Sequence, residues 1–340
     1  MLIMMQNRKV TASDVAEVAG VSRSSVSRAF TEGASIHPKK QQKILDAAKQ
    51  LGYQPNFFAR TLSTPNQKKR SNIVAILVSD LSNPYESYLF EALSSALQGH
   101  RKQPMLLNVK QADDLDAAIL QLSGYQIDGV VAVVGSLPAE HFHQCLKLSL
   151  PLITLGRSDD AGLIPSVQTD NQLAGEMAAK YLLSLGLTQL GFLAGRGDGQ
   201  ASNERYQGFK RYLMAVGYPE PVCLSAGSYR YQAGFEAALQ HQQQLQSLDG
   251  LFCAADSLAL GVMDCCRQEL NIAVPAQLRI VGCDDIPMAG WQGYQLTTLA
   301  QPVNRIAQQV ITLLEGIWAQ SENQPNLIKL EPELIVRKSA

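Results

Sequence analysis

Short, unbroken apolar runs recur along the chain from residue 73 onward, and this feature restricts the fold more than any other. The runs are IVAILV, PMLLNV, DGVVAVV, LPLITL, LGFLAG, GLFCAA and LRIVGC. Runs of this length are typical of parallel strands that are buried on both faces. Segments with helical periodicity, such as 85–100 and 171–185, separate them. Alternating strands and helices predict an α/β fold of doubly wound parallel sheets.

The apolar runs fall into two sets, which predicts two similar lobes within residues 73–340. In parallel α/β sheets, ligands bind outside the carboxyl ends of the strands. We therefore expect a small-molecule site in the cleft between the two lobes.

Residues 1–66 have a different pattern, which predicts a small all-α domain. Thr11 and Asp14 have the spacing of a capping box, in which each side chain bonds a free amide at the start of a helix. Gly20 tolerates positive φ and supplies a turn, and Ser22 is expected to cap a second helix. The residues expected to face inward from these two helices are apolar: Val15, Val18, Ala19, Val26, Ala29 and Phe30. Two short helices joined by such a turn form the helix-turn-helix pattern.

The outer face of the second helix and the local charge both indicate DNA binding. This face carries Arg23, Ser24, Ser25, Ser27 and Arg28. The first 70 residues hold twelve basic and four acidic residues, a net charge of +8, whereas the remainder carries −9. A basic segment on an acidic body is typical of a polyanion-binding module joined to another domain. Arginine can bond guanine in the major groove through two hydrogen bonds, so we predict that this helix reads DNA bases.

The domain boundary is expected in the segment STPNQKKRSN, which is polar, basic and interrupted by proline. We place a helix-turn-helix domain at 1–66, with a hinge helix at about 54–63, a connector at 67–72 and the sensor at 73–340. No apolar run approaches the roughly 20 residues that a membrane span needs. The first residues do not resemble a signal peptide, so we expect a cytoplasmic protein with no membrane partner.

Motifs for metals, cofactors or catalysis are not found. The six cysteines form no C-x-x-C pair, and we expect buried free thiols of a reducing compartment. His141 and His143 alternate, but no acidic or thiol cluster is close in sequence, so no metal is expected. The segment GRGDG at 195–199 matches neither the dinucleotide motif nor the P-loop and is interpreted as a loop beside the cleft. Without a recognisable nucleophile motif, an enzyme is not expected, and no cofactor is predicted.

The chain resembles the lactose-repressor (LacI/GalR) family. VTASDVAEVAGVSRSSVSRAF and LGYQPNFFARTLST are similar to its DNA-binding head and hinge. The resemblance continues through SDLSNPYESYLFEAL, VQTDNQLAGEMAAKYLLSLG, NERYQGF, FCAADSLALGVMDC, VGCDDIP and LTTLAQPV. It implies a periplasmic-binding-protein-like sensor behind the head.

The resemblance implies that Arg23 and Ser24 are the main base-reading positions. The complete predicted DNA-binding set is Thr11, Ser22, Arg23, Ser24, Ser25, Ser27, Arg28, Thr31, Asn56, Ala59 and Leu62. Leu62 would insert into the minor groove together with its symmetry mate, a known way of kinking DNA. The alternative for Leu62 is ordinary packing against the sensor.

The effector residues implied by the resemblance are Tyr85, Arg157, Asp170, Arg205, Asp256 and Asp284. Arginine and aspartate together suit a polyhydroxyl ligand, because each hydroxyl both donates and accepts. The alternatives are an ion pair for Arg205 and helix caps for Asp256 and Asp284. Two departures from the family, Ala255 in place of a common asparagine and Glu86 in place of a second aromatic residue, favour a sugar or related polar metabolite over a purine.

These features together predict an effector-modulated repressor that binds a palindromic operator as a homodimer. The chain shows no terminal leucine heptad, so a tetramer-forming helix is not expected. Three alternatives stay open: an activator, a regulator without an effector, and a repressor that responds to a purine or nucleoside. A two-lobed binding protein for sugar uptake is a further class, which the basic head argues against.

Overall fold

The computed structural model describes residues 8, 10–31, 34–54, 71–109, 112–133, 142–158, 161–321 and 325–340. Its contacts divide the chain into two compact units, the head (residues 1–71) and the body (residues 72–340). The predicted hinge residues Asn56, Ala59 and Leu62 lie outside the described residues, so their roles stay predictions.

The described part of the head folds into α1 (Ala12–Ala19), α2 (Arg23–Ala29) and α3 (Pro38–Leu51). The predicted capping box is present, because the Thr11 amide donates to the Asp14 carboxylate at 2.7 Å and the Asp14 amide donates to Thr11 Oγ1 at 3.4 Å. Gly20 follows α1 in the left-handed region at φ +60°. Ser22 caps α2 by accepting from the Ser25 amide at 3.3 Å. The helix-turn-helix therefore rests on the local signals that predicted it.

Two expectations about the packing of the head are wrong. The core of the head consists of Val15, Ala16, Ala19, Val26, Ala29, Ile44, Ala47 and Ala48. Val18 is 50% exposed, because α2 and α3 pack on the side of α1 that is centred on Val15, Ala16 and Ala19. Ser25 is only 2% exposed, since it lies beside the core residue Val26 on α2 and its hydroxyl lies 2.9 Å from Ser22 Oγ.

The first lobe of the body contains a parallel six-stranded sheet in the order β11-β5-β4-β3-β1-β2 within the described residues. The strands are β1 (Ile73–Val78), β2 (Gln103–Asn108), β3 (Gly129–Ala132), β4 (Leu152–Leu155), β5 (Ser166–Thr169) and β11 (Leu327–Leu330). The helices are α5 (Pro84–Gly99), α6 (Ala112–Gly124), α7 (His143–Lys147) and α13 (Val303–Ala319).

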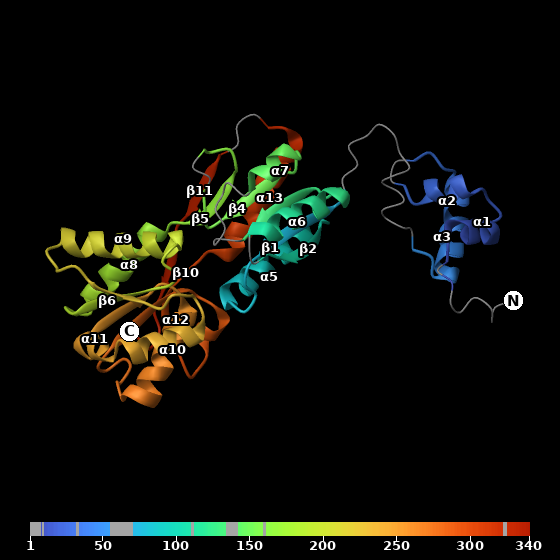
Figure 1. The fold of residues 1–340 in the computed structure, drawn as a ribbon. Coiled ribbons are helices and arrows are strands. Elements are labelled where there is room, and N and C mark those ends of the chain that lie inside the picture. Colours follow the sequence, from blue (N-terminus) through green and yellow to red (C-terminus); the bar gives the residue numbers. More distant parts are fainter. Residues whose placement is uncertain are drawn as a thin grey trace. The chain divides into compact units, whose positions relative to one another are not determined.

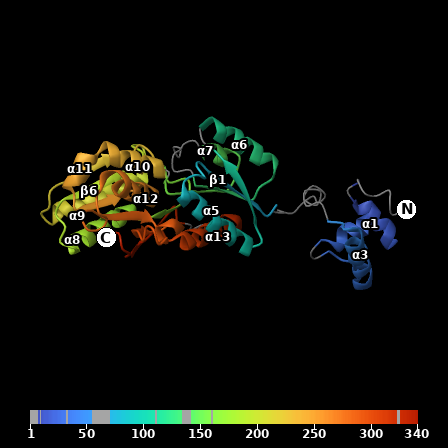
Figure 2. The same cartoon turned by 90° about the horizontal axis from the view of Figure 1, so that it is seen from below.

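Helices cover both faces of this sheet, as the prediction of a doubly wound sheet requires. Alternate β1 residues such as Ile76 pack in one apolar cluster with α5 and α13. Their neighbours, such as Leu77, pack in a second cluster with α6 and α7. Figure 2 shows β1 between these two pairs of helices. The unbroken apolar run of β1 is thus explained by burial on both sides.

The second lobe contains another six-stranded sheet, in the order β12-β10-β9-β8-β6-β7 within the described residues. The strands are β6 (Leu190–Ala194), β7 (Val222–Ser225), β8 (Gly250–Cys253), β9 (Arg279–Asp284), β10 (Thr297–Ala300) and β12 (Glu333–Ile335), of which β12 alone is antiparallel to its neighbour. The helices are α8 (Asn171–Ser184), α9 (Gln200–Ala215), α10 (Tyr231–Gln240), α11 (Gln242–Ser247) and α12 (Asp256–Cys265), with a π turn at Cys266–Leu270 and a 3-10 turn at Pro287–Gly290. Figure 1 shows this lobe in yellow and orange, beside the green and cyan first lobe.

Three described connections carry the chain between the lobes, namely β5 to α8, β10 to α13 and β11 to β12. They lie together, because the Asp170 amide of the first connection donates to the Leu330 carbonyl of the third at 2.8 Å, and Thr169 Oγ1 beside the first donates to Gln301 Oε1 of the second at 2.7 Å. In the second connection, the Gln301 amide donates to the Asp284 carbonyl at 3.2 Å. The strand ends and the lobe connections therefore meet in one region.

Five of the six cysteines are buried free thiols, as expected, but Cys223 is exposed. It lies on β7, an edge strand of the second sheet whose residues are mostly exposed. No described helix is both long and apolar enough to cross a membrane. The described residues also include no group of three or more His, Cys, Asp or Glu side chains placed to hold a metal ion.

Candidate functional site

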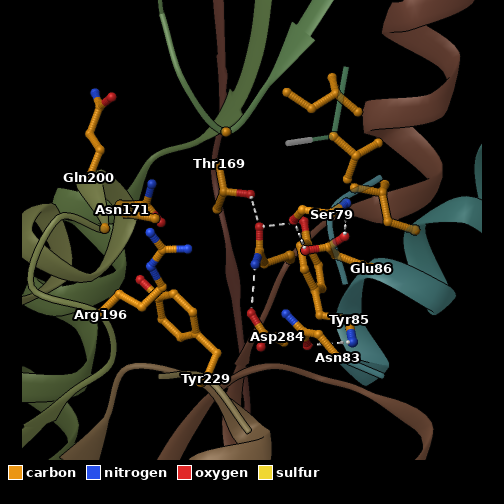
Figure 3. Close-up of a pocket in the computed structure, with 18 of the residues that line it drawn as sticks. Ser79, Asn83, Tyr85, Glu86, Thr169, Asn171, Arg196, Gln200, Tyr229 and Asp284 are labelled. Atoms are coloured by element: carbon orange, nitrogen blue, oxygen red, sulfur yellow. Dashed lines mark hydrogen bonds between the residues drawn. The ribbon is translucent and has the colours of Figure 1, made fainter. Parts of the chain in front are cut away.

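A cavity of about 310 Å³ lies between the two lobes of the body. Its walls come from the ends of β1, β4, β5, β6 and β9, from α5, α9 and α13, and from the lobe connections. Figure 3 shows Asn171, Arg196 and Tyr229 of the second lobe on one side and Ser79 and Glu86 of the first lobe on the other. The volume is in the range of small-molecule sites, which commonly lie outside the carboxyl ends of parallel strands.

Arg205 on α9 is the buried cation of this cavity, with 4% of its surface exposed. Its Nε donates to Asn171 Oδ1 on α8 at 2.9 Å, its Nη1 donates to the Ala254 carbonyl, and Asp284 Oδ1 lies 3.7 Å from Nη1. Helices α8 and α9 can approach closely because Gly175 lacks a side chain, and an added Cβ there would overlap the Arg205 carbonyl. Local glycine placement thus brings the amide and the guanidinium together.

Gln301, in the connection between β10 and α13, joins groups from both lobes. Its Oε1 accepts from the hydroxyls of Tyr85 on α5 at 2.8 Å and Thr169 on β5 at 2.7 Å. Its Nε2 donates to Asp284 Oδ1 at 2.6 Å. A ligand that hydrogen-bonds Asp284 would therefore compete with Gln301, which also bonds Tyr85 and Thr169 of the first lobe. Figure 3 shows Thr169 and Asp284 at the two ends of this chain of hydrogen bonds.

Asp284 is held in a strained loop by Asp256, which is fully buried. The φ angles of Asp284 and Asp285 are +136° and +56°, a region that residues other than glycine rarely adopt. The Asp256 carboxylate accepts from the Ile286 amide just beyond this loop at 3.0 Å and from Thr298 Oγ1 on β10 at 2.5 Å. Asp256 therefore positions the loop from which Asp284 reaches the cavity.

Burial raises the pKa of both carboxyl groups, Asp256 and Asp284. Removal from water raises the pKa of Asp256 to about 8, and the nearby Asp284 charge adds to the shift. Burial also raises the pKa of Asp284, to about 6, although Arg205 and the Gln301 amide act in the opposite direction. The cavity thus contains a carboxyl whose pKa is raised by burial, next to the buried guanidinium of Arg205.

The structure brings three of the six predicted effector residues together, since Tyr85, Arg205 and Asp284 line the cavity. Arg157, Asp170 and Asp256 are not part of its lining. Asp170 caps α8 by accepting from the Leu173 amide at 3.0 Å, and the Arg157 carbonyl accepts from Thr154 and Ser166.

Asp256 is neither a cap nor a cavity residue, because Ala255 occupies the cap position and the Asp256 carboxylate bonds Thr298 and the Ile286 amide instead. The sequence around Asp256 could not predict these contacts, because both partners of its carboxylate are more than 25 residues away in sequence.

Reasoning from the sequence missed Asn171, Gln301 and Tyr229 as lining residues. The close approach of Tyr229 explains two glycines of the segment 195–199, because a Cβ at Gly195 would overlap the Tyr229 ring and a Cβ at Gly199 would overlap its hydroxyl. Its interpretation as a loop beside the cleft agrees with Arg196, Asp198 and Gly199, which also line the cavity.

Glu86, which follows Tyr85 in place of an aromatic residue, has a local role. Its carboxylate accepts from the Ser79 amide at 2.9 Å, the Ser79 hydroxyl at 2.9 Å and the Asp80 amide at 3.0 Å. Burial raises the pKa of this carboxyl above its ordinary value. Glu86 therefore supports the loop after β1, with its oxygens already bonded to protein.

One ion pair bridges the lobes beside the cavity. Arg230 of the second lobe donates to Asp80 Oδ2 of the first lobe from Nη2 at 3.0 Å and from Nε at 3.1 Å. Both residues also line the cavity, although the Arg230 side chain is 64% exposed. This pair is an exposed contact between parts of the chain that are 150 residues apart.

In the head, the structure sorts the predicted DNA contacts by exposure. Arg23, Ser24, Ser27 and Arg28 on α2 are exposed, whereas Ser25 is buried. Thr11 and Ser22 are exposed cap residues, and Thr31 donates from Oγ1 to the Ser27 carbonyl at 2.9 Å. The outer face of α2 therefore offers two arginines and two serines in a helix-turn-helix frame.

A helix-turn-helix head joined to a two-lobed body with an interlobe cavity defines a ligand-responsive DNA-binding protein. Comparisons with known proteins agree. Residues 11–56 match the model of bacterial regulatory proteins of the lacI family, and residues 179–340 match a periplasmic binding protein-like domain. The sucrose operon repressor of Pediococcus pentosaceus is 30% identical over 322 residues, which cover 90% of this chain and 91% of that protein. The chain belongs to the lacI family of transcriptional regulators.

Solved structures have the same fold. The lac repressor dimer bound to operator and the anti-inducer ONPF is 23% identical, with a TM-score of 0.86 and coverage of 98% of this chain and 99% of that one. The transcriptional regulator CelR in complex with cellobiose is 25% identical, with a TM-score of 0.72 and coverage of 98% and 100%. These relatives are transcriptional regulators rather than enzymes, and this chain is a DNA-binding transcriptional regulator with an effector-binding body.

Proposed function

We propose that this regulator is a repressor that binds a palindromic operator as a homodimer and that a small polyhydroxylated ligand in the interlobe cavity changes its affinity for DNA. The observation that carries the proposal is the convergence of Arg205, Asn171 and Asp284 in one cavity of about 310 Å³. These groups supply charged donors and acceptors from which water is largely removed. Such sites select ligands whose hydroxyls can both donate and accept.

The connections between the lobes suggest how ligand binding would reach the head. Asp284 bonds Gln301, and Gln301 bonds Tyr85 of the first lobe. A hydroxyl that bonds Asp284 would weaken this chain and favour a different arrangement of the lobes. The ligand needs only to bind the two arrangements unequally in order to change operator affinity.

In the head, we assign base reading to Arg23 and Ser24, with Ser27 and Arg28 beside them on the exposed face of α2. We leave Ser25 out of this set because it is buried. Because its target is operator DNA, we place the protein in the cytoplasm. The relative named as a sucrose operon repressor supports both the repressor role and a sugar-class ligand.

The test is a thermal-shift screen of the full chain against sugars, sugar phosphates, nucleosides and purines. A ligand at a hundredfold excess over its Kd stabilises the folded state by about 2.7 kcal/mol. Compounds that bind are then tested for their effect on operator binding. We expect a sugar-class compound to bind and Arg205→Ala to weaken it by about a hundredfold, because a buried hydrogen bond to a charged group contributes about 1.5–3 kcal/mol.

A purine-responsive repressor is the second candidate, because the rings of Tyr85 and Tyr229 both line the cavity and could stack on a base. Binding of a purine or nucleoside, with no sugar bound, would establish this candidate in place of the first.

For either candidate, Arg211→Ala on the exposed part of α9 is the matched control for Arg205→Ala, since Arg211 bonds Gln172 and does not line the cavity.

A further inference from the structure

The loop after β9 keeps two successive residues in backbone conformations that side chains disfavour. The φ angles of Asp284 and Asp285 are +136° and +56°, in a region that residues other than glycine rarely adopt. Asp256 holds the loop only one residue further on, where its carboxylate accepts from the Ile286 amide. The left-handed conformation of Asp285 is held by a different contact, which comes from a distant part of the chain.

Arg337, which follows β12, makes this contact. Its Nη2 donates to Asp285 Oδ1 at 2.7 Å, and its Nη1 donates to the Leu296 carbonyl at 2.8 Å. One planar guanidinium therefore joins the two ends of the segment 285–296. The Arg337 and Asp285 side chains are 19% and 29% exposed, so this ion pair is better shielded from water than the exposed ion pair between the lobes.

The backbone that carries Arg337 is fixed on both sides. Before Arg337, β12 pairs with β10. After it, the Ser339 hydroxyl donates to the Ile280 carbonyl at 2.6 Å and accepts from the Thr297 amide at 2.8 Å. Ser339 is only 1% exposed, and the Arg337 amide itself donates to Thr297 Oγ1 at 2.9 Å. The guanidinium therefore extends from a support that is bonded to both β9 and β10.

We propose that Arg337 is a positioning residue that acts on effector binding through Asp285 and thereby keeps Asp284 in the cavity. Arg337 does not line the cavity itself. The consequence for ligand binding rests on the proposed function, because it assumes that Asp284 bonds the effector. The hold of Arg337 on the loop does not depend on that assumption and is tested without a ligand.

The first experiment measures hydrogen–deuterium exchange of the full-length protein in fragments that contain residues 284–286. Arg337→Met keeps a long side chain but loses both hydrogen bonds of the guanidinium. We expect exchange in these fragments to become about tenfold faster, because a hydrogen bond to a charged group holds the loop closed. Asp285→Ala breaks the same pair from the other side and should have a similar effect, so the test does not depend on the folding of one variant.

Arg267→Met is the matched control. Arg267 also belongs to the second lobe, and its Nη1 donates to the Gly293 carbonyl at 2.7 Å and lies 3.7 Å from Asp264 Oδ1. It thus bonds a carbonyl and an aspartate, as Arg337 does, but its aspartate lies on α12 rather than in the loop after β9. Exchange of residues 284–286 that is no faster in Arg337→Met than in this control would overturn the inference.

A glycine at position 285 separates positioning from general support of the fold. Glycine adopts positive φ without strain and has no side chain for Arg337 to bond. In the Asp285→Gly background, Arg337→Met should therefore cause no further acceleration of exchange. The same acceleration in both backgrounds would mean that Arg337 acts through Leu296 instead of Asp285, which is incompatible with the proposal.

The second experiment titrates the same variants with cellobiose, sucrose, ribose and glucose 6-phosphate by calorimetry. For the sugar that binds, we expect affinity to fall several-fold in Arg337→Met and to stay unchanged in Arg267→Met, because only molecules with the loop in place bind through Asp284. Faster exchange with unchanged sugar affinity would refute the role of Arg337 toward the effector. Absence of binding by all four compounds would count against the sugar-class function, while faster exchange would still support the hold of Arg337 on the loop.

Discussion

The head and the body present their recognition groups in opposite ways. In the head, Arg23, Ser24 and Arg28 stand exposed on α2, outside a core built from other residues. In the body, Asn171 and Arg205 are at most 4% exposed and are bonded to each other. Base reading can therefore change in the head with little effect on stability. In the body, by contrast, ligand binding and stability depend on the same hydrogen bonds.

The difference follows from the size and polarity of the two ligands. DNA presents wide grooves and phosphates, which exposed side chains can reach without leaving water. A small ligand offers few contacts, so each must be made in a desolvated cavity where hydrogen bonds are stronger. Buried polar groups in such a cavity need protein partners when no ligand is present.

Removing Asp256 is expected to have the largest effect on stability. Asp256→Ala leaves the Thr298 hydroxyl and the Ile286 amide without their buried partner and should lower the free energy of unfolding by about 3 kcal/mol. Urea denaturation measures the change, and Glu91→Ala on the exposed face of α5 is the control. A loss below about 1 kcal/mol would show that Asp256 does not hold the Asp284 loop.

A substitution in the head should change DNA recognition and leave the stability of the fold unchanged. Arg23→Ala is expected to lower discrimination between operator and non-operator DNA by about 1–3 kcal/mol, with the melting temperature unchanged, because its side chain is exposed. Competition binding at fixed salt measures this discrimination. Ser25→Ala is the matched control on the same helix and should leave base preference unchanged, since Ser25 is buried. Unaltered discrimination in Arg23→Ala would refute its assigned role.

The pH dependence of stability should come from the body. Burial raises the pKa of Asp256 to about 8 and that of Asp284 to about 6, both above the ordinary value of 3.8. Over this window the folded protein retains protons that the unfolded chain has released, so raising the pH lowers the free energy of unfolding. Between pH 6 and 8, one such group lowers the free energy of unfolding by at most about 1.4 kcal/mol per pH unit.

Asp256→Asn tests the origin of that slope, because its amide can still bond Thr298 and accept from Ile286 but does not titrate. Urea midpoints at pH 6, 7 and 8 should fall with pH in the unmodified protein and fall less in the variant, in which only Asp284 of this pair still titrates. A midpoint that rises with pH in the unmodified protein would contradict the assigned shifts.

The smallest effect is expected at the ion pair between the lobes. Asp80→Asn removes the charge that Arg230 contacts across the cavity. Exposed ion pairs contribute about 0.2–1 kcal/mol, so effector affinity should change by less than about fivefold. The change should also disappear at high salt, because exposed charges are screened. A salt-independent change larger than tenfold would show that this exposed pair behaves like the buried groups.

Much of the fold could be predicted from the sequence, because its signals are local. The capping box at Thr11 and Asp14 and the turn at Gly20 each involve residues within a few positions of one another. The seven apolar runs all became strands. Six of them are buried on both faces, which leaves a continuous apolar pattern, whereas β2 lies at the edge of its sheet and none of its residues is buried. The short strands β5, β7, β10, β11 and β12 were not separately predicted, because they have weaker patterns and depend on neighbours far along the chain.

Local sequence patterns predicted the helix-turn-helix and seven of the described strands, and the family resemblance implied three residues of the cavity, Tyr85, Arg205 and Asp284. Packing of the folded chain exposes Val18, places Asp256 behind the site and brings Gln301 into contact with both lobes. The two groups of features differ in the sequence distance over which their interactions act. Caps and turns act within a few residues, whereas Gln301 meets Tyr85 across 216 residues, and only packing of the whole body brings them within hydrogen-bond distance.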